Sequence, residues 1–323
     1  MFVLAAEAPT VPPPLTVTRG FTAWEFDPYL AAVVLVAAGL YLYGVWRLRG
    51  RGDRWSGWRT FSFVVLGLGS IVVATQSFLA TYDTTLFSVH MVQHMVLSMV
   101  SPIFLALGAP VTLALRTLAR RPRRWLLVLL HSRVSKVLTF PLLTWSVFVG
   151  TPFALYFTSW YGLTLRNTYF HEALHLHFLL VGCLFFWPLL GLDPVPGRIP
   201  YPFRMLVVFL ALPVHAWLGI AIMSSTEVLG GDWYANLGRE WGASSLSDQR
   251  TGGGILWASG DLVGLIILGS LFVQWLHASE REAERVDRRL DRQERRAAGE
   301  PGEESELAAY NAMLARLHAR SRR

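Results

Sequence analysis

Long hydrophobic segments alternate with short polar ones along most of this chain. Each segment is long enough to cross roughly 30 Å of hydrocarbon as an α-helix, and a helix satisfies its own backbone hydrogen bonds in lipid. The pattern therefore predicts an all-α fold, a polytopic membrane helix bundle of about seven transmembrane helices over residues 28–277. The expected spans are 28–46, 61–80, 87–108, 137–157, 171–191, 204–224 and 255–277.

Three regions are expected to flank or interrupt this pattern. Residues 1–27 contain several prolines and predict an irregular external lead-in. Residues 278–323 alternate acidic and basic side chains at helical spacing, which predicts a charged cytoplasmic helical tail. This tail either contacts the membrane surface or docks a partner. Segment 111–130 mixes apolar and basic residues, so it either spans the membrane or lies along the cytoplasmic interface.

Composition and charge support a membrane location. The chain is 53% hydrophobic and carries a net charge of +7. Its basic residues are concentrated in the first, third and fifth loops between the predicted helices, which is the positive-inside pattern. This distribution predicts that the N-terminus lies outside and the C-terminus in the cytoplasm. The lipid bilayer accounts for the basic charge, so no nucleic-acid partner is expected.

Five histidines lie inside the predicted spans. His90 and His94 open one span, His171 and His175 open another, and His215 lies in a third. Residues four apart share one face of an α-helix, and the predicted topology places all five at a similar depth in the outer half of the membrane. A lone buried histidine is usually structural, but ionisable groups inside spans are functional candidates. The set predicts a group of metal ligands or a proton relay.

The surrounding residues narrow the chemistry. Imidazole ligands suit copper, zinc or haem iron. Met91 and Met95 lie beside the histidine face and would add thioether ligands suited to Cu(I), although methionine is also ordinary packing material. Asp261 is expected at the same depth, where it would orient an imidazole. Cys183 is the only cysteine, which excludes an internal disulfide and a thiolate cluster.

No sequence pattern favours catalysis. The chain has no HExxH motif, no glycine-rich phosphate loop and no GxSxG elbow. The TGGG at 251–254 is expected in an external loop, as a hinge or turn. We therefore do not expect an enzyme.

Several motifs together resemble one known family. The stretches HMVQHMVLSMVSPIFLALGAP, HEALHLHFLLVGCLFFWPLLGLDPVPGR, HAWLG and DQRTGGGILWASGDL are similar, in this order, to the CtaG-type cytochrome c oxidase assembly factors of the polytopic type. The resemblance covers roughly residues 28 to 277. An unrelated single-span copper chaperone with cysteine ligands shares the name, and this chain departs from that type entirely.

The resemblance implies a multi-pass protein of the bacterial inner (plasma) membrane that helps to mature a haem–copper oxidase. It implies copper delivery, with the oxidase subunits and a periplasmic copper chaperone as partners. The residues that match the family's positions are His90, His94, His171, His175 and His215, with Asp261 at its acidic position.

The favoured hypothesis is an assembly factor that holds copper, as Cu(I), at an outward-facing intramembrane histidine site and passes it to the oxidase by ligand exchange. Because ligation requires neutral imidazole, binding should weaken as pH falls through the histidine range. Three alternatives stay open: a membrane haem protein with axial histidines, a copper or proton transporter, and a metal-free assembly scaffold.

Overall fold

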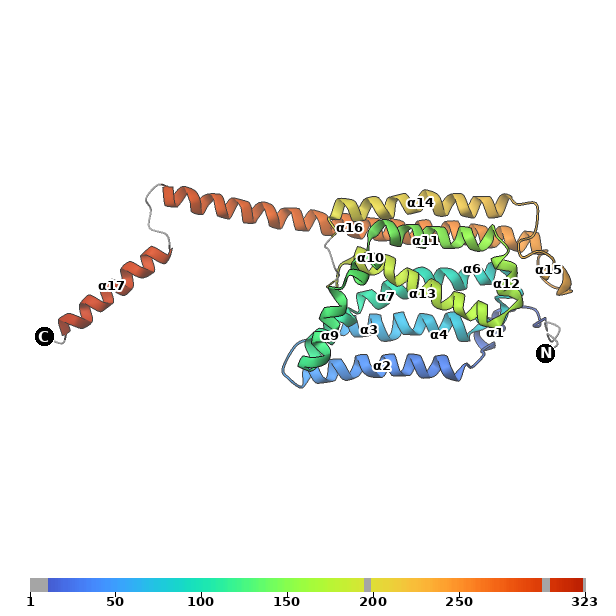
Figure 1. Cartoon of the computed structure of the whole chain (residues 1–323), viewed down its shortest axis with the longest axis horizontal. Coiled ribbons are helices and arrows are strands. Elements are labelled where there is room, and N and C mark those ends of the chain that lie inside the picture. The colour runs from blue at the N-terminus through green and yellow to red at the C-terminus, as the bar shows by residue number, and fades with distance from the viewer. Residues whose placement is uncertain (1–10, 195–198, 298–302, 322–323) are drawn as a thin grey trace. The chain divides into compact units, whose positions relative to one another are not determined.

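The computed structural model describes residues 11–194, 199–297 and 303–321, and every regular element within them is a helix. Six of these helices are long and apolar enough to cross a membrane, or seven if one bent pair is counted as a span. The predicted all-α polytopic bundle is therefore confirmed (Figure 1).

Each predicted span corresponds to a helix or to a continuous run of helices, and two of the runs contain a π-helical stretch, named η1 and η2. The first three spans are α2 (Pro28–Arg49), the run of α3 (Gly57–Phe61), η1 (Ser62–Leu68), α4 (Gly69–Gln76) and α5 (Phe78–Tyr82), and the run of α6 (Phe87–Met95), η2 (Val96–Val100) and α7 (Ser101–Leu107). The next four are the bent pair α11 (Pro141–Tyr156) and α12 (Trp160–Arg166), then α13 (Thr168–Leu190), α14 (Tyr201–Ser224) and α16 (Ser245–Ala297). The shorter helices are α1 (Val17–Thr22), α8 (Pro110–Thr117), α9 (Arg120–Leu130), α10 (Arg133–Leu138), α15 (Trp233–Asn236) and α17 (Glu303–Ser321).

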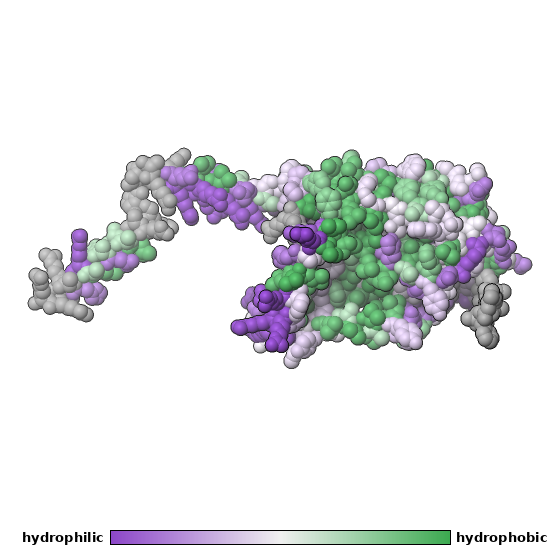
Figure 2. Space-filling model, viewed as in Figure 1, coloured by the Kyte–Doolittle hydropathy of each residue, from purple (hydrophilic) through white to green (hydrophobic). Residues whose placement is uncertain are grey.

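The chain forms two compact units, Met1–Gly269 and Ser270–Arg323. Within the first unit, α13 and the α6–α8 segment are central, because 56% and 50% of their most apolar windows are buried, against 17% for α2. The outer faces of the peripheral helices are apolar and exposed, for example at Val33, Leu40 and Phe209. Figure 2 shows this hydrophobic surface bounded by polar residues at both ends of the bundle. A soluble protein rarely exposes so large an apolar surface, so this surface fits lipid.

Segment 111–130 forms two short helices rather than one long one. The chain turns between α7 and α8 at Ala109, whose φ of 47° is left-handed. Candidate spans within the described residues include α8, as an extension of α6 and α7, but not α9. Figure 1 shows α9 lying across the end of the bundle where α2 finishes, and Trp125 on α9 is largely exposed. This geometry agrees with the interfacial alternative for the second half of the segment.

A buried carboxylate fixes the start of α8. Asp193, which follows α13, accepts hydrogen bonds from the backbone N–H groups of Val111 at 3.2 Å and Thr112 at 2.7 Å, and from Trp187 Nε1 at 3.0 Å. These two amides belong to the first turn of a helix, where the backbone donors have no partner within the helix. Asp193 therefore caps α8 from a distant part of the chain.

One close contact between helices brings the two histidine-bearing segments together. Pro102 lacks an N–H group, so it cannot donate the helical hydrogen bond to the carbonyl oxygen of Ser98, four residues earlier. Ser98 itself lies in the π-helical stretch η2. A Cβ atom added to Gly182 of α13 would lie 2.1 Å from that Ser98 oxygen and 2.6 Å from Pro102 Cγ. Only glycine allows α13 to approach η2 and α7 this closely.

The prediction that 251–254 forms a loop is wrong. These residues lie inside α16. Their glycines permit helix packing instead of a turn, because a Cβ on Gly253 would lie 2.8 Å from the carbonyl oxygen of Gly219 on α14, and one on Gly252 would lie 2.4 Å from Phe87 Cδ1. Loop composition and a tight helix interface use the same residue type, which explains the error.

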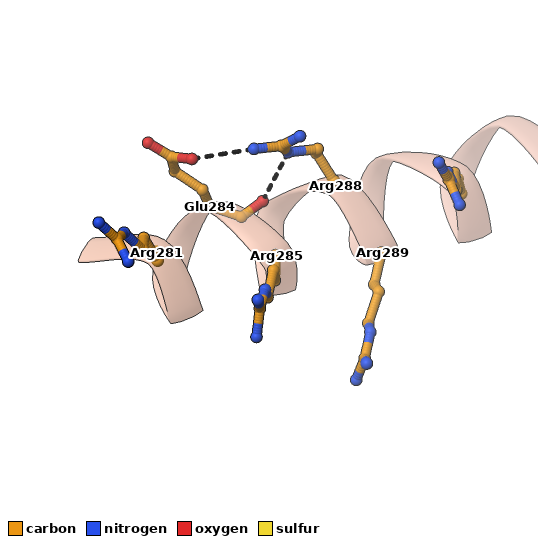
Figure 3. Close-up of a pocket in the computed structure, with 6 residues that line it drawn as sticks. Arg281, Glu284, Arg285, Arg288 and Arg289 are labelled. Carbon is orange, nitrogen blue, oxygen red and sulfur yellow. Dashed lines mark hydrogen bonds and ion pairs between the residues drawn. The ribbon is translucent and has the colours of Figure 1, made fainter. Parts of the chain in front are cut away.

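The second unit contains the charged end of α16 and the helix α17, and it confirms a charged helical tail over its described residues. Figure 3 shows Arg285 and Arg289 on one side of α16 and the pair of Glu284 with Arg288 on the other. This pair is 2.9 Å long and its side chains are more than 60% exposed. Exposed ion pairs of this kind contribute at most about 1 kcal/mol to stability.

Candidate metal centre

Four of the five predicted histidines form one buried cluster between α6 and α13. The ring centroids of His90 and His94 are 3.9 Å apart, and those of His171 and His175 are 4.5 Å apart. Across the two helices, His90 lies 5.5 Å from His171 and His94 lies 6.1 Å from His175. Each of these residues is at most 5% exposed. The two pairs, each spaced four residues apart, therefore face each other.

Polar caps hold the starts of both helices beside this cluster. The Asn167 side chain accepts a hydrogen bond from the Phe170 N–H at 3.1 Å and begins α13. The α6 helix has no side-chain cap of its own. Instead, the buried Asp248 of α16 accepts from the Ser88 backbone N–H at 3.3 Å and from the Ser88 hydroxyl. These contacts position the first turns, where His90 and His171 lie.

Tyr156 of α11 determines which nitrogen of His94 is free. The Tyr156 hydroxyl donates to Met91 Sδ at 3.5 Å, and the same oxygen lies 3.0 Å from His94 Nδ1. When the hydroxyl donates to the sulfur, His94 Nδ1 is the donor in the second contact, and this is the tautomer that metal ligation through Nε2 requires. A neutral imidazole then carries a lone pair on Nε2. This His94 Nε2 atom is buried and has no hydrogen-bond partner among the described residues.

Gln93 in turn determines which ring nitrogen of His175 is free. The Gln93 amide donates from Nε2 to the carbonyl oxygen of Ala74 at 3.0 Å, and its Oε1 lies 3.0 Å from His175 Nε2. An amide oxygen can only accept, so His175 Nε2 carries the proton and Nδ1 carries the lone pair. That Nδ1 atom is buried without a hydrogen-bond partner in the described structure, and the nearest carboxylate oxygen, of Glu172, is 3.5 Å away.

The remaining two histidines are less well satisfied. Both ring nitrogens of His90 are buried without a partner among the described residues, as is His171 Nε2. Asp83, just before α6, places Oδ2 3.6 Å from His171 Nε2. Burial raises the pKa of the Asp83 carboxyl to about 7, because a charged form is disfavoured away from water.

The unpaired atoms are arranged as metal ligands. In each of two groups, His90 with His94 and His171, and Asp83 with His171 and His175, the ligand atoms lie within 4.8 Å of one another. His171 is common to both. Buried polar groups almost always have hydrogen-bond partners, so several unpaired lone pairs around one point are unusual. The donor set fits a metal ion that prefers nitrogen ligands.

His215 lies outside this cluster but lines a cavity together with His94. Both residues line a small cavity of about 20 Å³ that is also lined by Met91, Met95 and Tyr156. His215 is not a member of either ligand group. Asp261 accepts a hydrogen bond from Trp257 Nε1 at 2.8 Å and follows Gly260, whose backbone lies against the His215 ring. Asp261 is therefore a neighbour of His215 and not of the four-histidine cluster.

Sequence reasoning missed three residues of the centre. Asp83 lies in the short connection before α6, where a carboxylate is usually solvated, but the residue is only 5% exposed. Gln93 and Tyr156 were not singled out. A polar Gln93 next to a histidine inside an apolar span is a signal that could have been found, but the contact of Tyr156 with His94 joins residues 62 positions apart, and no local pattern predicts it.

The fold and the buried polar centre define a class: polytopic all-helical membrane proteins with a buried histidine cluster. The chain belongs to the cytochrome c oxidase caa3 assembly factor family, whose sequence model matches residues 39–278.

Relatives among the curated proteins come from mycobacteria. The chain is 39% identical over 314 residues to uncharacterized proteins of Mycobacterium bovis and Mycobacterium tuberculosis, and 38% identical to one of Mycobacterium leprae. Each alignment covers 95% of this chain and 46% of the relative, so the chain spans about half the length of the curated relatives it matches. No solved structure matches the chain.

Proposed function

We propose that this protein is an assembly factor for a haem–copper cytochrome c oxidase, and that it holds Cu(I) at the four-histidine cluster before passing it to the oxidase subunits. The family membership supports the assembly role. The observation that carries the copper site is the set of buried, unpaired imidazole nitrogens that converge from α6 and α13. The role is one of binding and transfer, without a catalytic step.

The two overlapping ligand groups support a transfer mechanism. One group contains the imidazoles of His90 and His94, and the other contains the Asp83 carboxylate and His175. His171 belongs to both, so an ion can stay bound to it while the other ligands exchange. Stepwise exchange keeps the ion coordinated at every stage, and departure occurs when ligands of the oxidase replace those of this protein.

Topology gives the direction of delivery. The positive-inside distribution favours an external N-terminus and a cytoplasmic C-terminus, and the histidines lie in the first turns of α6 and α13, near the external side in that orientation. A periplasmic copper chaperone would then supply the metal from outside the bacterial inner membrane. Tyr156 and Gln93 would keep the ligand nitrogens aimed and deprotonated, as hydrogen-bond partners of metal-ligating histidines commonly do.

One observation weighs against the haem alternative. The cavity next to the histidines is about 20 Å³, whereas pockets for organic ligands are typically on the order of 300–1,000 Å³. The available space suits an ion and not a macrocycle. A metal-free scaffold would not need several buried imidazole nitrogens without partners, since each unsatisfied group costs roughly 1–3 kcal/mol.

The proposed transfer can be tested on the oxidase itself. A host that depends on this protein for its haem–copper oxidase would carry the wild type, His171→Ala or the control His177→Ala, and the copper-to-haem ratio of the purified oxidase would be measured. His177 is on the same helix but is partly exposed and contacts Thr151 instead of the cluster. We expect His171→Ala to yield copper-deficient oxidase and His177→Ala to match the wild type. A copper-replete oxidase with His171→Ala would contradict the role of the cluster.

A further inference from the structure

The small cavity beside His94 has an unusual donor set. Two thioethers, from Met91 and Met95, and two imidazoles, from His94 and His215, line its 20 Å³. All four side chains are at most 6% exposed. The rest of the wall is largely aromatic, with Phe178 4.4 Å from the His94 ring and Phe148 5.4 Å from the His215 ring, measured between centroids.

The size of the cavity limits its occupant. A cavity needs about 10–15 Å³ to hold one water molecule, so this one has room for a single water or a single ion. Ser98 and Tyr156 also line the cavity, but the Tyr156 hydroxyl already contacts Met91 and His94. A buried water needs two to four hydrogen-bond partners, and thioether sulfur is only a weak acceptor. Soft sulfur ligands together with imidazole instead favour Cu(I) among biological metal ions.

Hydrogen bonds to neighbouring groups indicate which atoms of the cavity-lining residues carry free lone pairs. The Nδ1 atom of His215 lies 3.2 Å from the carbonyl oxygen of Ala211, which can only accept, so Nδ1 carries the proton and Nε2 carries the lone pair. The Sδ atom of Met91 accepts from the hydroxyl of Tyr156, itself a wall residue. His94 has its lone pair on Nε2, as deduced above from the same tyrosine.

We propose that this cavity is a second, deeper Cu(I) position, with Met91, Met95, His94 and His215 as its ligands. The proposal rests on the proposed function, because it extends the path of the same ion. His94 belongs both to the ligand group with His90 and His171 and to the cavity wall. The ion moves by ligand exchange: its bonds to His90 and His171 break as bonds to sulfur and His215 form. It remains Cu(I) throughout, so no oxidant or reductant is required.

Anaerobic Cu(I) titration against a colorimetric chelator, with X-ray absorption spectra of the loaded protein, tests this position. The variants are Met91→Leu/Met95→Leu and His215→Ala. Leucine conserves volume closely, so the core should stay folded. Met99→Leu is the matched control, since Met99 lies on the same face of the run and is 4% exposed, but does not line the cavity.

We expect one equivalent of Cu(I) in the wild type, shared between the two positions because both use His94, and a sulfur contribution to the copper scattering. The double methionine variant should lose that contribution while it still binds copper through nitrogen, and Met99→Leu should behave as the wild type. His215→Ala should reduce the sulfur contribution without removing copper binding.

Nitrogen-only coordination in the wild type, or sulfur scattering that persists in Met91→Leu/Met95→Leu, would overturn the second position. One tightly bound equivalent with nitrogen ligands alone would leave the proposed function standing and remove only this inference. A wild type that binds no Cu(I) would remove both.

Discussion

Two buried polar centres in the first unit differ in how completely their hydrogen bonds are satisfied. The Asp193 carboxylate accepts from two backbone amides and an indole at one end of the molecule. In the histidine cluster between α6 and α13, each of the four rings has a nitrogen without a hydrogen-bond partner among the described residues. Both centres are almost completely buried, so burial alone does not distinguish them.

The difference separates a structural role from a binding role. A carboxylate that satisfies otherwise unpaired helix amides stabilises the fold whether or not a ligand is present. A cluster with unsatisfied lone pairs lowers the stability of the metal-free protein. Binding of a metal ion offsets this cost, because the ion satisfies those lone pairs. Loss of the first centre should therefore reduce stability, while loss of the second should reduce metal binding.

The largest effect is expected for Asp193→Ala. Removal of the carboxylate leaves the amides of Val111 and Thr112 and the indole of Trp187 without their acceptor, at about 3 kcal/mol or more in total. Thermal unfolding in detergent should show a clear fall in Tm, with Cu(I) affinity unchanged in the folded fraction. Asp193→Asn keeps one acceptor oxygen, so its Tm should lie between those of the wild type and Asp193→Ala. An unchanged Tm for Asp193→Ala would remove its structural role.

His171→Ala should have the largest effect on binding. This residue is the member shared by both ligand groups, so its loss leaves neither group complete. We expect Cu(I) affinity to fall at least about 100-fold, equivalent to about 2.8 kcal/mol, with little loss of thermal stability. Chelator competition measures the affinity. A large fall in Tm with unchanged Cu(I) affinity would show that the histidine cluster has a structural role and not a binding role.

Tyr156→Phe should have an intermediate effect. It keeps the ring packing but removes the hydroxyl that holds His94 Nδ1 at 3.0 Å. Loss of a hydrogen-bond partner of a metal-ligating histidine typically weakens metal binding about 10- to 100-fold. Tyr161→Phe is a useful control, because the Tyr161 hydroxyl contacts Tyr234 and not a histidine. Equal Cu(I) affinity in wild type and Tyr156→Phe would show that His94 needs no such partner.

Asp83→Asn should change stability with the opposite sign to Asp193→Ala, and only in the pH range where Asp83 ionises. Burial raises the folded-state pKa of Asp83 to about 7, above that of an unfolded aspartate near 4. The folded protein therefore loses stability as pH rises from about 4 to about 7, because only the unfolded state ionises freely. Metal-free Asp83→Asn should thus be more stable than the wild type at pH 8, and the difference should be almost gone at about pH 4. Thermal unfolding at both pH values checks this, with the exposed Asp53→Asn as control.

The sequence predicted the helices well because each span must satisfy its own backbone and present apolar side chains to lipid. It also placed His90, His94, His171 and His175 on facing sides of two helices, since spacing alone sets a helix face. The depth expected for those residues rests on the charges of the loops and stays a prediction.

The parts that the sequence did not predict depend on contacts between distant segments. Gly252 and Gly253 have the composition of a loop, and only their contacts with Phe87 and α14 explain them as helix-packing positions. Asp83 is buried because α6 and α13 begin on either side of it, and the pairing of Tyr156 with His94 requires the position of α11. No local pattern encodes these distances.

The most direct test of the account is the copper content of detergent-purified protein loaded anaerobically with Cu(I), measured by mass spectrometry beside a visible spectrum. His90→Ala/His94→Ala removes half of the cluster, and His177→Ala is the control from the same region. The account predicts near-stoichiometric copper without a Soret band in the wild type and the control, and loss of copper in the double variant. A well-folded wild type without copper, or a double variant that retains it fully, would contradict the central claim.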